Sequence, residues 1–184
     1  MCLRHGLWIG EGVSTENDQV DLTACPEIIQ AHRYHRCLIS RLGRVPIAYA
    51  YYESRSIQLE WVAQGRFQDV RARRFDRLLG SGWRVNRESA VLNAVIYPEV
   101  VALTGILASA YWRSLAASLA PMNVMRFYGE VGNRVHPGYR RAGNGFDPLR
   151  QWVEALAHPV WLGRATRSPS AVFAANEHDY LDTH

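Results

Sequence analysis

The feature that most restricts the fold is an uncharged, largely apolar run near the middle of the chain. No Asp, Glu, Lys or Arg lies between Glu99 and Arg113, and the 13 residues between them are too few to span a bilayer. Pro98 suits the first turn of a helix and Pro121 suits the position after one, so the run predicts a core helix over residues 98–119. We therefore expect a protein built around this helix, with no integral membrane segment.

The composition agrees with a single folded domain. Of the 184 residues, 48% are hydrophobic and 21% are charged, so the chain can bury a core of its own. We predict one α+β domain over residues 1–170 and an acidic C-terminal tail over 171–184. The three cysteines have no CxxC spacing, and the N-terminus has no apolar run of signal-peptide length. A cytoplasmic location is the expectation, with peripheral contact at the inner membrane as the alternative.

Four segments have the residue pattern of strands. Val45–Tyr52 is rich in β-forming residues, and residues 57–61 alternate between apolar and polar side chains, so we predict that they form an antiparallel pair. Val124–Val131 is a third predicted strand, and residues 160–162 are a short fourth. Helices are predicted over residues 26–35, 66–79 and 147–157. Because strands and helices do not alternate regularly, we predict the α+β class, with a small mixed sheet flanked by helices.

All 21 residues counted as Lys or Arg are arginines, and the chain contains no lysine. This excludes Schiff-base chemistry and the Walker nucleotide loop, whose lysine reaches the phosphates. The formal net charge is +4, but residues 31–87 hold 12 Arg against four acids, for a net charge of +8. A basic region of this kind indicates a polyanionic partner.

The helix predicted over residues 66–79 combines an apolar face with arginines. At 100° per residue three of these arginines cluster on one side, and the fourth lies near the border of that side. The candidate DNA-binding residues are Arg66, Arg73, Arg74 and Arg77. They can follow a phosphate backbone, and tyrosines 49, 51 and 52 of the neighbouring predicted strand can stack on bases. The alternative is a solvated face whose arginines pair with Asp69 and Asp76.

A glycine-rich loop over residues 132–145 is the second candidate site. Glycine amides beside arginines form a nest for phosphate groups, so this loop is a candidate nucleotide site. The candidate ligands are Arg134, Gly138, Arg140 and Arg141. Glu130 and His136 are the candidate catalytic residues, either for general acid–base chemistry or, for Glu130, for holding Mg²⁺. The alternative is an ordinary irregular connection.

The common enzyme motifs are absent. The chain contains no GxSxG, HExxH, GxGxxG or EF-hand pattern, so an orthodox hydrolase, zinc protease or dinucleotide-binding enzyme has no support. His32, His35 and Cys37 have a spacing that metal ligands use, but no second ligand cluster accompanies them. We therefore predict no protein-bound metal centre at these residues.

The opening half, from LWIGEGVSTENDQ to SIQLEWV, resembles the Osa-type plasmid fertility-inhibition factors. These factors are similar to the ParB/sulfiredoxin fold, in which a Gly-x-Arg-Arg loop holds nucleotide phosphates, and Gly138-Tyr139-Arg140-Arg141 has that form. Gln64-Gly65-Arg66 fits the strand–Gly–Arg–helix order of the same family, which leaves Arg66 as an alternative phosphate ligand.

The resemblance implies a plasmid-encoded factor that blocks conjugative transfer of a competing element's DNA through a type IV secretion channel. It implies ATP as a cofactor, with Mg²⁺, and ATP-linked nuclease action on the transferred DNA. It also implies DNA and type IV secretion components as partners. A non-catalytic DNA- or protein-binding inhibitor of the transfer apparatus is the alternative.

Overall fold

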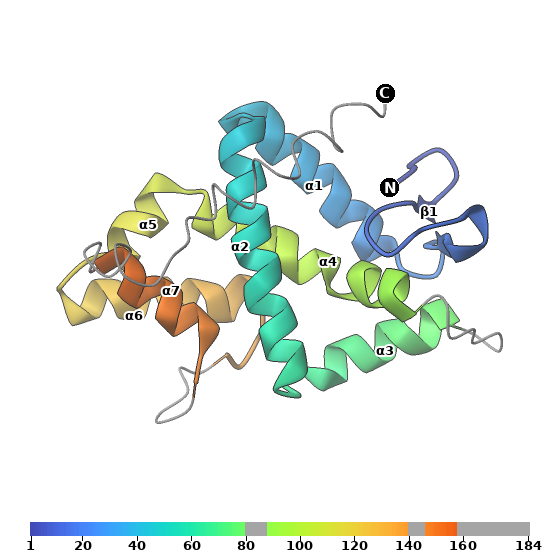
Figure 1. The fold of residues 1–184 in the computed structure, drawn as a ribbon. Helices are drawn as coiled ribbons and strands as arrows, with labels where there is room; N and C mark the ends of the chain where they lie inside the picture. Colours follow the sequence, from blue (N-terminus) through green and yellow to red (C-terminus); the bar gives the residue numbers. More distant parts are fainter. Residues whose placement is uncertain (80–87, 140–145, 158–184) are drawn as a thin grey trace.

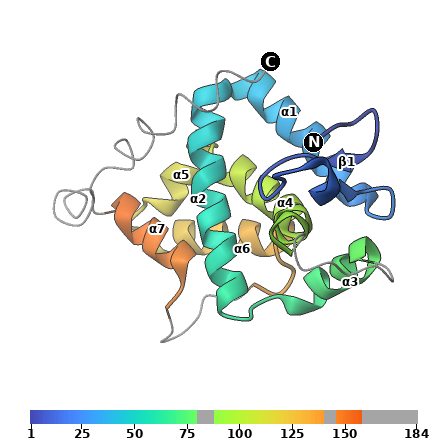
Figure 2. The ribbon, with the colours of Figure 1, turned by 45° about the vertical axis from the view of Figure 1, so that its right-hand side comes forward.

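The computed structural model describes residues 1–79, 88–139 and 146–157 (Figures 1 and 2). Two predicted phosphate ligands, Arg140 and Arg141, lie outside the described residues, as do the predicted strand at 160–162 and the predicted acidic tail. Within the described residues the chain is mostly helical and has one small antiparallel sheet, which is compatible with the α+β class.

The elements follow one another in the order β1 (Leu7–Trp8), the 3₁₀ helix η1 (Glu16–Asp18), β2 (Val20–Asp21), α1 (Pro26–Leu42), α2 (Arg44–Ala63), α3 (Gln68–Leu79), α4 (Glu88–Leu107), α5 (Ala110–Ala116), α6 (Pro121–Arg134) and α7 (Pro148–Ala157). In the sheet, Leu7 is opposite Asp21 and Trp8 is opposite Val20. Pro26 and Pro148 each occupy the first position of a helix, as predicted from their fixed φ.

The predicted antiparallel pair over residues 45–52 and 57–61 is wrong, because both segments belong to the single helix α2. Apart from one adjacent pair, the buried side chains of α2 recur every three or four residues, which is the period of a helix. They are Ile47, Ala50, Ser54, Ile57, Gln58 and Trp61. Burial of one helical face of α2 therefore outweighs the local β propensity of its tyrosines and branched residues.

The strand predicted over Val124–Val131 is also wrong, since these residues lie in α6. Phe127 and Val131 are its buried residues and are four positions apart, as on one face of a helix. Pro121 begins this helix instead of ending the one before it. The mixed sheet expected from the three strands is thus not formed by the residues predicted to form it.

The uncharged run over residues 100–112 is divided between α4 and α5, with Ala108 and Ser109 between the two helices, so the single helix predicted over residues 98–119 is not formed. α4 begins at Glu88 and ends at Leu107, and Pro98 lies inside it, where its ring removes a backbone hydrogen bond to residue 94. Within the described residues, Ser89–Leu107 is the one stretch long and apolar enough to cross a membrane, and 78% of its most apolar window is buried inside the protein. That burial is typical of a core helix.

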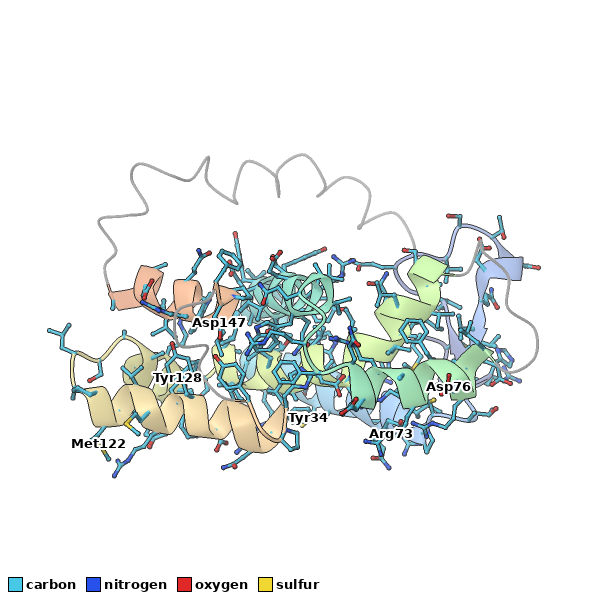
Figure 3. All side chains as sticks on the ribbon, turned by 90° about the horizontal axis from the view of Figure 1, so that it is seen from below. Tyr34, Arg73, Asp76, Met122, Tyr128 and Asp147 are labelled. Carbon is cyan, nitrogen blue, oxygen red and sulfur yellow. The ribbon has the colours of Figure 1, made fainter. Side chains whose placement is uncertain are left out.

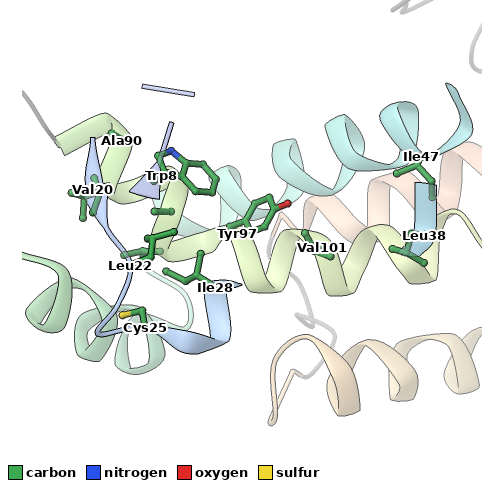
Figure 4. Close-up of a cluster of buried hydrophobic side chains, with 13 residues drawn as sticks. Trp8, Val20, Leu22, Cys25, Ile28, Leu38, Ile47, Ala90, Tyr97 and Val101 are labelled. Atoms are coloured by element: carbon green, nitrogen blue, oxygen red, sulfur yellow. The ribbon is translucent and has the colours of Figure 1, made fainter. Parts of the chain in front are cut away.

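Two groups of buried side chains meet on α4, which runs through the middle of the molecule (Figures 1 and 2). The first joins the N-terminal segment and α1 to α4, and in it the rings of Trp8 and Tyr97 meet edge to face at 5.1 Å (Figure 4). The second joins the end of α4 to α2, α6 and α7 around Trp61 and Phe127. α4 therefore contributes side chains to both groups, which we call the two halves of the core.

Candidate nucleic-acid interface

The four arginines predicted to form a DNA-binding face do not share one surface. α3 confirms the predicted helix, although it begins at Gln68, so that Arg66 lies in the turn before it. Arg73 and Arg77 are exposed, whereas Arg74 is only 8% exposed. Arg74 therefore belongs to the protein interior, where it cannot reach a DNA backbone.

Arg74 ties three helices together. Its Nη1 donates to Glu99 Oε2 at 2.6 Å and to the Val95 carbonyl at 2.8 Å, both on α4, and its Nε donates to Glu27 Oε1 at 3.3 Å on α1. Burial disfavours the charge, but the bonds to Glu99 and Glu27 outweigh it and raise the pKa of Arg74. The guanidinium is thus a permanent cation that neutralises the buried Glu99 carboxylate.

Arg73 and Arg77 lie beside a shallow hollow that also contains acids. Arg77 forms an ion pair with Glu27 and donates to the Ala24 carbonyl at 3.2 Å. Asp76 and Glu27 share the lining of this hollow with the arginines, and Figure 3 labels Arg73 and Asp76 along α3. Arg77 thus pairs with an acid of another helix, whereas Arg73 donates to the Asp69 backbone carbonyl at 3.3 Å, and the surface has mixed charge.

Arg66, the alternative phosphate ligand, is part of a half-buried cluster around Asp147. Its Nη1 lies 3.3 Å from Asp147 Oδ2, and its guanidinium lies over the rings of Trp61, Phe67 and Tyr139 at 5.2–5.6 Å from their centroids. This combination of an ion pair with three cation–π contacts holds the side chain against the protein. The Arg66 side chain is therefore engaged in contacts that stabilise the fold.

Asp147 is the centre of this cluster, which we call the Asp147 cluster, formed by Trp61, Arg66, Phe67, Tyr139 and Asp147. The carboxylate accepts hydrogen bonds from Trp61 Nε1 at 3.3 Å, from the Tyr139 hydroxyl at 2.9 Å and from the Leu149 amide at 3.0 Å. The last of these confirms Asp147 as the N-cap of α7. Burial, and then the negative charge of Asp147, raise the pKa of Tyr139.

His136 is buried in the core beside the Asp147 cluster, with 2% of its surface exposed. Its ring stacks on Phe67 with the centroids 3.8 Å apart, and its Nε2 donates to Gln58 Oε1 at 3.1 Å. Burial, and then the positive charges of Arg71, Arg74 and Arg66, lower the pKa of His136 to about 3. The ring is therefore neutral near pH 7, and it has no access to a substrate in solvent.

The remaining loop residues lie at the end of α6. Glu130 forms an ion pair with Arg134 one helical turn later, so each predicted site residue neutralises the other. Gly138 has a φ of +89° and is exposed, and a Cβ added there would meet no atom within 4 Å. The glycine is thus needed for the backbone turn. Within the described residues, no group of three or more His, Cys, Asp or Glu side chains could hold a metal ion.

The arginines that do share an exposed surface lie on α1 and at the start of α2. We call this surface the basic hairpin face, formed by Arg33, Arg36, Arg41 and Arg44, all exposed. They follow one another at intervals of three to five residues, and no Asp or Glu occurs between Glu27 and Glu53. None of the four forms an ion pair with another described residue. Their charge is therefore available to an external polyanion.

Aromatic rings lie on the same two helices. Tyr34, Tyr49 and Tyr52 are all exposed. The His35 ring stacks on Tyr51 at 5.1 Å, and Tyr51 meets Tyr52 edge to face at 6.1 Å, so the aromatic contacts continue from α1 to α2. Exposed tyrosines beside arginines are the groups on which unpaired bases stack.

The basic hairpin face lies within the basic region at residues 31–87, whereas the candidate DNA-binding residues of the sequence lie on α3 and in the turn before it. The missed signal is the absence of acids between Glu27 and Glu53. It was obscured by the strand predicted over Val45–Tyr52, which hid the helical hairpin that presents the four arginines together.

His32 and His35 have a structural role on the inner side of α1. Their Nδ1 atoms lie 3.2 Å and 2.8 Å from the hydroxyl oxygen of Tyr97 on α4. Burial lowers the pKa of both histidines, to about 4 for His32. The two rings thus fix which side of α1 faces α4, and the arginines are left outside.

No protein-family model, curated protein or solved structure matches this chain. The inference of function therefore depends on the geometry above and on the residues of the chain itself.

Proposed function

We propose that this protein is a plasmid-encoded fertility-inhibition factor that blocks conjugative transfer of a competing element by binding nucleic acid at the basic hairpin face. The observation that carries the proposal is the set of four exposed arginines on α1 and α2, with no acid between Glu27 and Glu53. Arginine forks suit phosphate groups, and their release of counterions drives binding.

The dimensions of the hairpin fit a nucleic-acid backbone. Arg33 and Arg41 are eight positions apart, which corresponds to about 12 Å along a helix axis. Gly43, with a φ of +89°, joins the two helices and keeps Arg44 close to the end of α1. Arg33 and Arg41 are thus far enough apart along α1 to contact different phosphates.

Two observations support a binding role over a catalytic one. His136 is neutral and enclosed by Phe67 and Gln58, and Glu130 is paired with Arg134. A general base needs contact with the proton that it removes, and a metal ligand needs a free carboxylate. The burial of His136 and the ion pair of Glu130 thus favour a binding role.

The ATP-linked nuclease with the ParB/sulfiredoxin-like fold is the second candidate function. Its support is the exposed Gly138 at positive φ, immediately before Tyr139-Arg140-Arg141, in the form of the family's phosphate loop. In that candidate, ATP would be held by Gly138, Arg140 and Arg141 without a lysine. The resemblance to the ParB/sulfiredoxin-like fold is limited to this loop, because the strands predicted over residues 45–52, 57–61 and 124–131 are helical.

The role in fertility inhibition is supported by the resemblance of residues 7–62, the stretch that contains the whole basic hairpin face. Binding of the transferred DNA, or of a type IV secretion component that carries it, would then be the inhibitory step. The location would be cytoplasmic, close to the channel at the inner membrane.

The test is fluorescence anisotropy of a labelled oligonucleotide at several salt concentrations. We expect Arg33→Gln/Arg36→Gln to weaken binding about tenfold or more and to reduce the salt slope by about two, one for each lost phosphate contact. The control, Arg4→Gln/Arg113→Gln, removes the same charge from exposed positions outside the face and should bind within about twofold of the parent protein.

The same oligonucleotide distinguishes the two candidate functions. Under the proposal it stays intact after incubation with the protein, ATP and Mg²⁺, and the Arg33→Gln/Arg36→Gln variant no longer reduces plasmid transfer between mating cells. Cleavage that depends on ATP would support the nuclease candidate in place of the proposal. Equal binding of the oligonucleotide by both double variants would show that the basic hairpin face is not the binding surface.

A further inference from the structure

Arg71 on α3 is a buried cation that no acid of the described residues neutralises. Its side chain is only 5% exposed. The buried Glu99 carboxylate already pairs with Arg74 at 2.6 Å, and the buried Asp147 carboxylate pairs with Arg66 at 3.3 Å. Arg71 itself forms no ion pair with a described residue. A buried charge without a partner is unfavourable, so this position favours a negative charge from outside the chain.

The Arg71 guanidinium also has a buried N–H group that is not used within the protein. Nη2 donates to the carbonyl of Arg66, whereas Nη1 has no hydrogen-bond partner among the described residues. Burial lowers the pKa of Arg71, and the negative charge of Glu99 opposes this effect. Arginine nevertheless keeps its proton in proteins, so Nη1 remains a charged donor that can bind an anion.

A second unused donor lies beside the same group of side chains. Gln58 Oε1 accepts from His136 Nε2 at 3.1 Å, whereas Gln58 Nε2 has no hydrogen-bond partner in the described part of the chain. Arg71 is also close to His136, since its positive charge is the main cause, after burial, of the lowered pKa of that ring. The neutral ring adds no positive charge of its own. Two N–H donors without partners thus lie beside His136.

The turn between α2 and α3 places these groups by means of an unfavourable backbone conformation. Phe67 has a φ of +58°, in the left-handed region that a bulky side chain rarely adopts. Its ring stacks on His136 with the centroids 3.8 Å apart, and the carbonyl of the preceding Arg66 accepts from Arg71. Unfavourable backbone conformations of this kind are concentrated at ligand-binding sites.

We propose that a single chloride ion binds between Arg71 Nη1 and Gln58 Nε2, beside the His136 ring. One guanidinium without an acid matches one monovalent anion. Because the side chains that would hold it are at most 5% exposed, the ligand is a small inorganic ion rather than a nucleotide. The inference does not depend on the nucleic-acid proposal, since none of these residues belongs to the basic hairpin face.

The test is thermal unfolding of the full chain at constant ionic strength, with chloride exchanged for gluconate, which is too large for the site. We expect about 200 mM chloride to raise the melting temperature of the parent protein by about 3–6 °C, as for a dissociation constant of about 10 mM. Arg71→Met removes the cation and should abolish this rise. The matched control Arg73→Met removes an exposed arginine from the same helix and should keep it.

Gln58→Glu supplies the negative charge from within the protein. The carboxylate has the shape of the amide, so one oxygen still accepts from His136 Nε2 and the other meets Arg71 Nη1. In gluconate this variant should melt at or above the temperature that the parent protein reaches in chloride, and added chloride should have no further effect. If the variant instead melts below the parent protein in gluconate, Gln58 and Arg71 do not share a site and the proposal is overturned.

The line width of the chloride NMR signal measures binding directly, because a bound chloride ion relaxes faster than a free one. The excess width caused by the parent protein should be reduced in Arg71→Met and unchanged in Arg73→Met. The proposal is also overturned if the parent protein melts at the same temperature in both salts, or if the two arginine variants respond alike to chloride. If Arg71→Met does not fold, the parent protein and Gln58→Glu decide the question.

Discussion

Single arginines of this chain have opposite roles that their residue type does not reveal. Arg74 is an interior cation with three partners, while Arg33 and Arg36, on α1, are exposed and have no ion pair with another described residue. The difference arises from the helix face on which each one falls and from the acids within reach. A surface arginine can be replaced with little effect on stability, whereas a buried one leaves a charge behind.

We predict that Arg74→Gln lowers the free energy of unfolding by about 3–5 kcal/mol, because Glu99 is then buried without its cation. Urea unfolding of the variant and the parent protein measures the difference. Arg33→Gln is the matched control and should change the free energy by less than about 0.5 kcal/mol. The role assigned to Arg74 would be wrong if the two variants were equally stable.

The buried His136 predicts a pH dependence of stability. Its pKa in the folded protein is about 3, against 6.5 for the ordinary side chain, so the unfolded chain binds the proton more readily. The stabilising contribution is complete above pH 6.5 and is lost progressively as the pH falls toward 3. Urea unfolding at pH 7 and pH 4.5 should show a smaller decrease for His136→Phe than for the parent protein. An identical decrease would contradict the neutral, buried state of this ring.

At the scale of the elements, the structure depends on a few polar side chains that each hold several helices together. The Asp147 cluster links the end of α2, the turn before α3 and the start of α7 through one carboxylate. Arg74 does the same for α1, α3 and α4. The Asp147 cluster connects helix ends, where backbone amides and carbonyls need partners, whereas Arg74 connects the middle of α3 and of α4 to the start of α1.

We predict that Asp147→Ala releases α7 from the rest of the protein. The variant loses the N-cap, two hydrogen bonds and the partner of Arg66, at a cost of about 2–4 kcal/mol in unfolding free energy. Asp147→Asn keeps an oxygen for the Leu149 amide and should lose less. The measurement is chemical unfolding followed by tryptophan fluorescence, which reports on Trp61. Equal losses in the two variants would show that the cap carries none of the effect.

The sequence allowed some elements to be predicted and not others, for physical reasons. Pro26 and the Asp147-Pro148 pair give local signals of helix starts, and both predictions are confirmed. Tyrosines and branched residues of α2 and α6 favour strands locally, but the buried residues of both segments have helical spacing and pack in the core beside α4. The site followed the same rule, because charge is visible in sequence but burial is not. Arg66 and Arg74 were therefore assigned to a surface that they do not occupy.

At the scale of the whole molecule, α4 connects two groups of core side chains that otherwise belong to different ends of the chain. Val91 and Tyr97 belong to the first group, and Leu103 and Leu107 belong to the second. If either group loses its packing, α4 is disrupted, and the other group then loses the helix against which it packs. We expect the two halves to unfold together in one cooperative transition.

A destabilising substitution in one half should therefore lower the unfolding midpoint of both halves equally. Leu103→Ala should cost about 2–5 kcal/mol and shift the fluorescence and far-ultraviolet dichroism transitions to the same new midpoint. Tryptophans report on both halves, since Trp8 lies in the first and Trp61 in the second. Two separated transitions would show that α4 does not couple them.

The shared helix also decides what a ligand-binding experiment can reveal about this protein. A ligand held only by α1 and α2 stabilises the folded state as a whole, in proportion to its concentration over its dissociation constant. Amide protons of α6 and α7 that exchange only through global unfolding will then be protected from exchange by a strand of DNA that never touches them. A thermal-shift screen will therefore detect such a ligand without locating it, and only substitutions on the basic hairpin face will show that the ligand binds there.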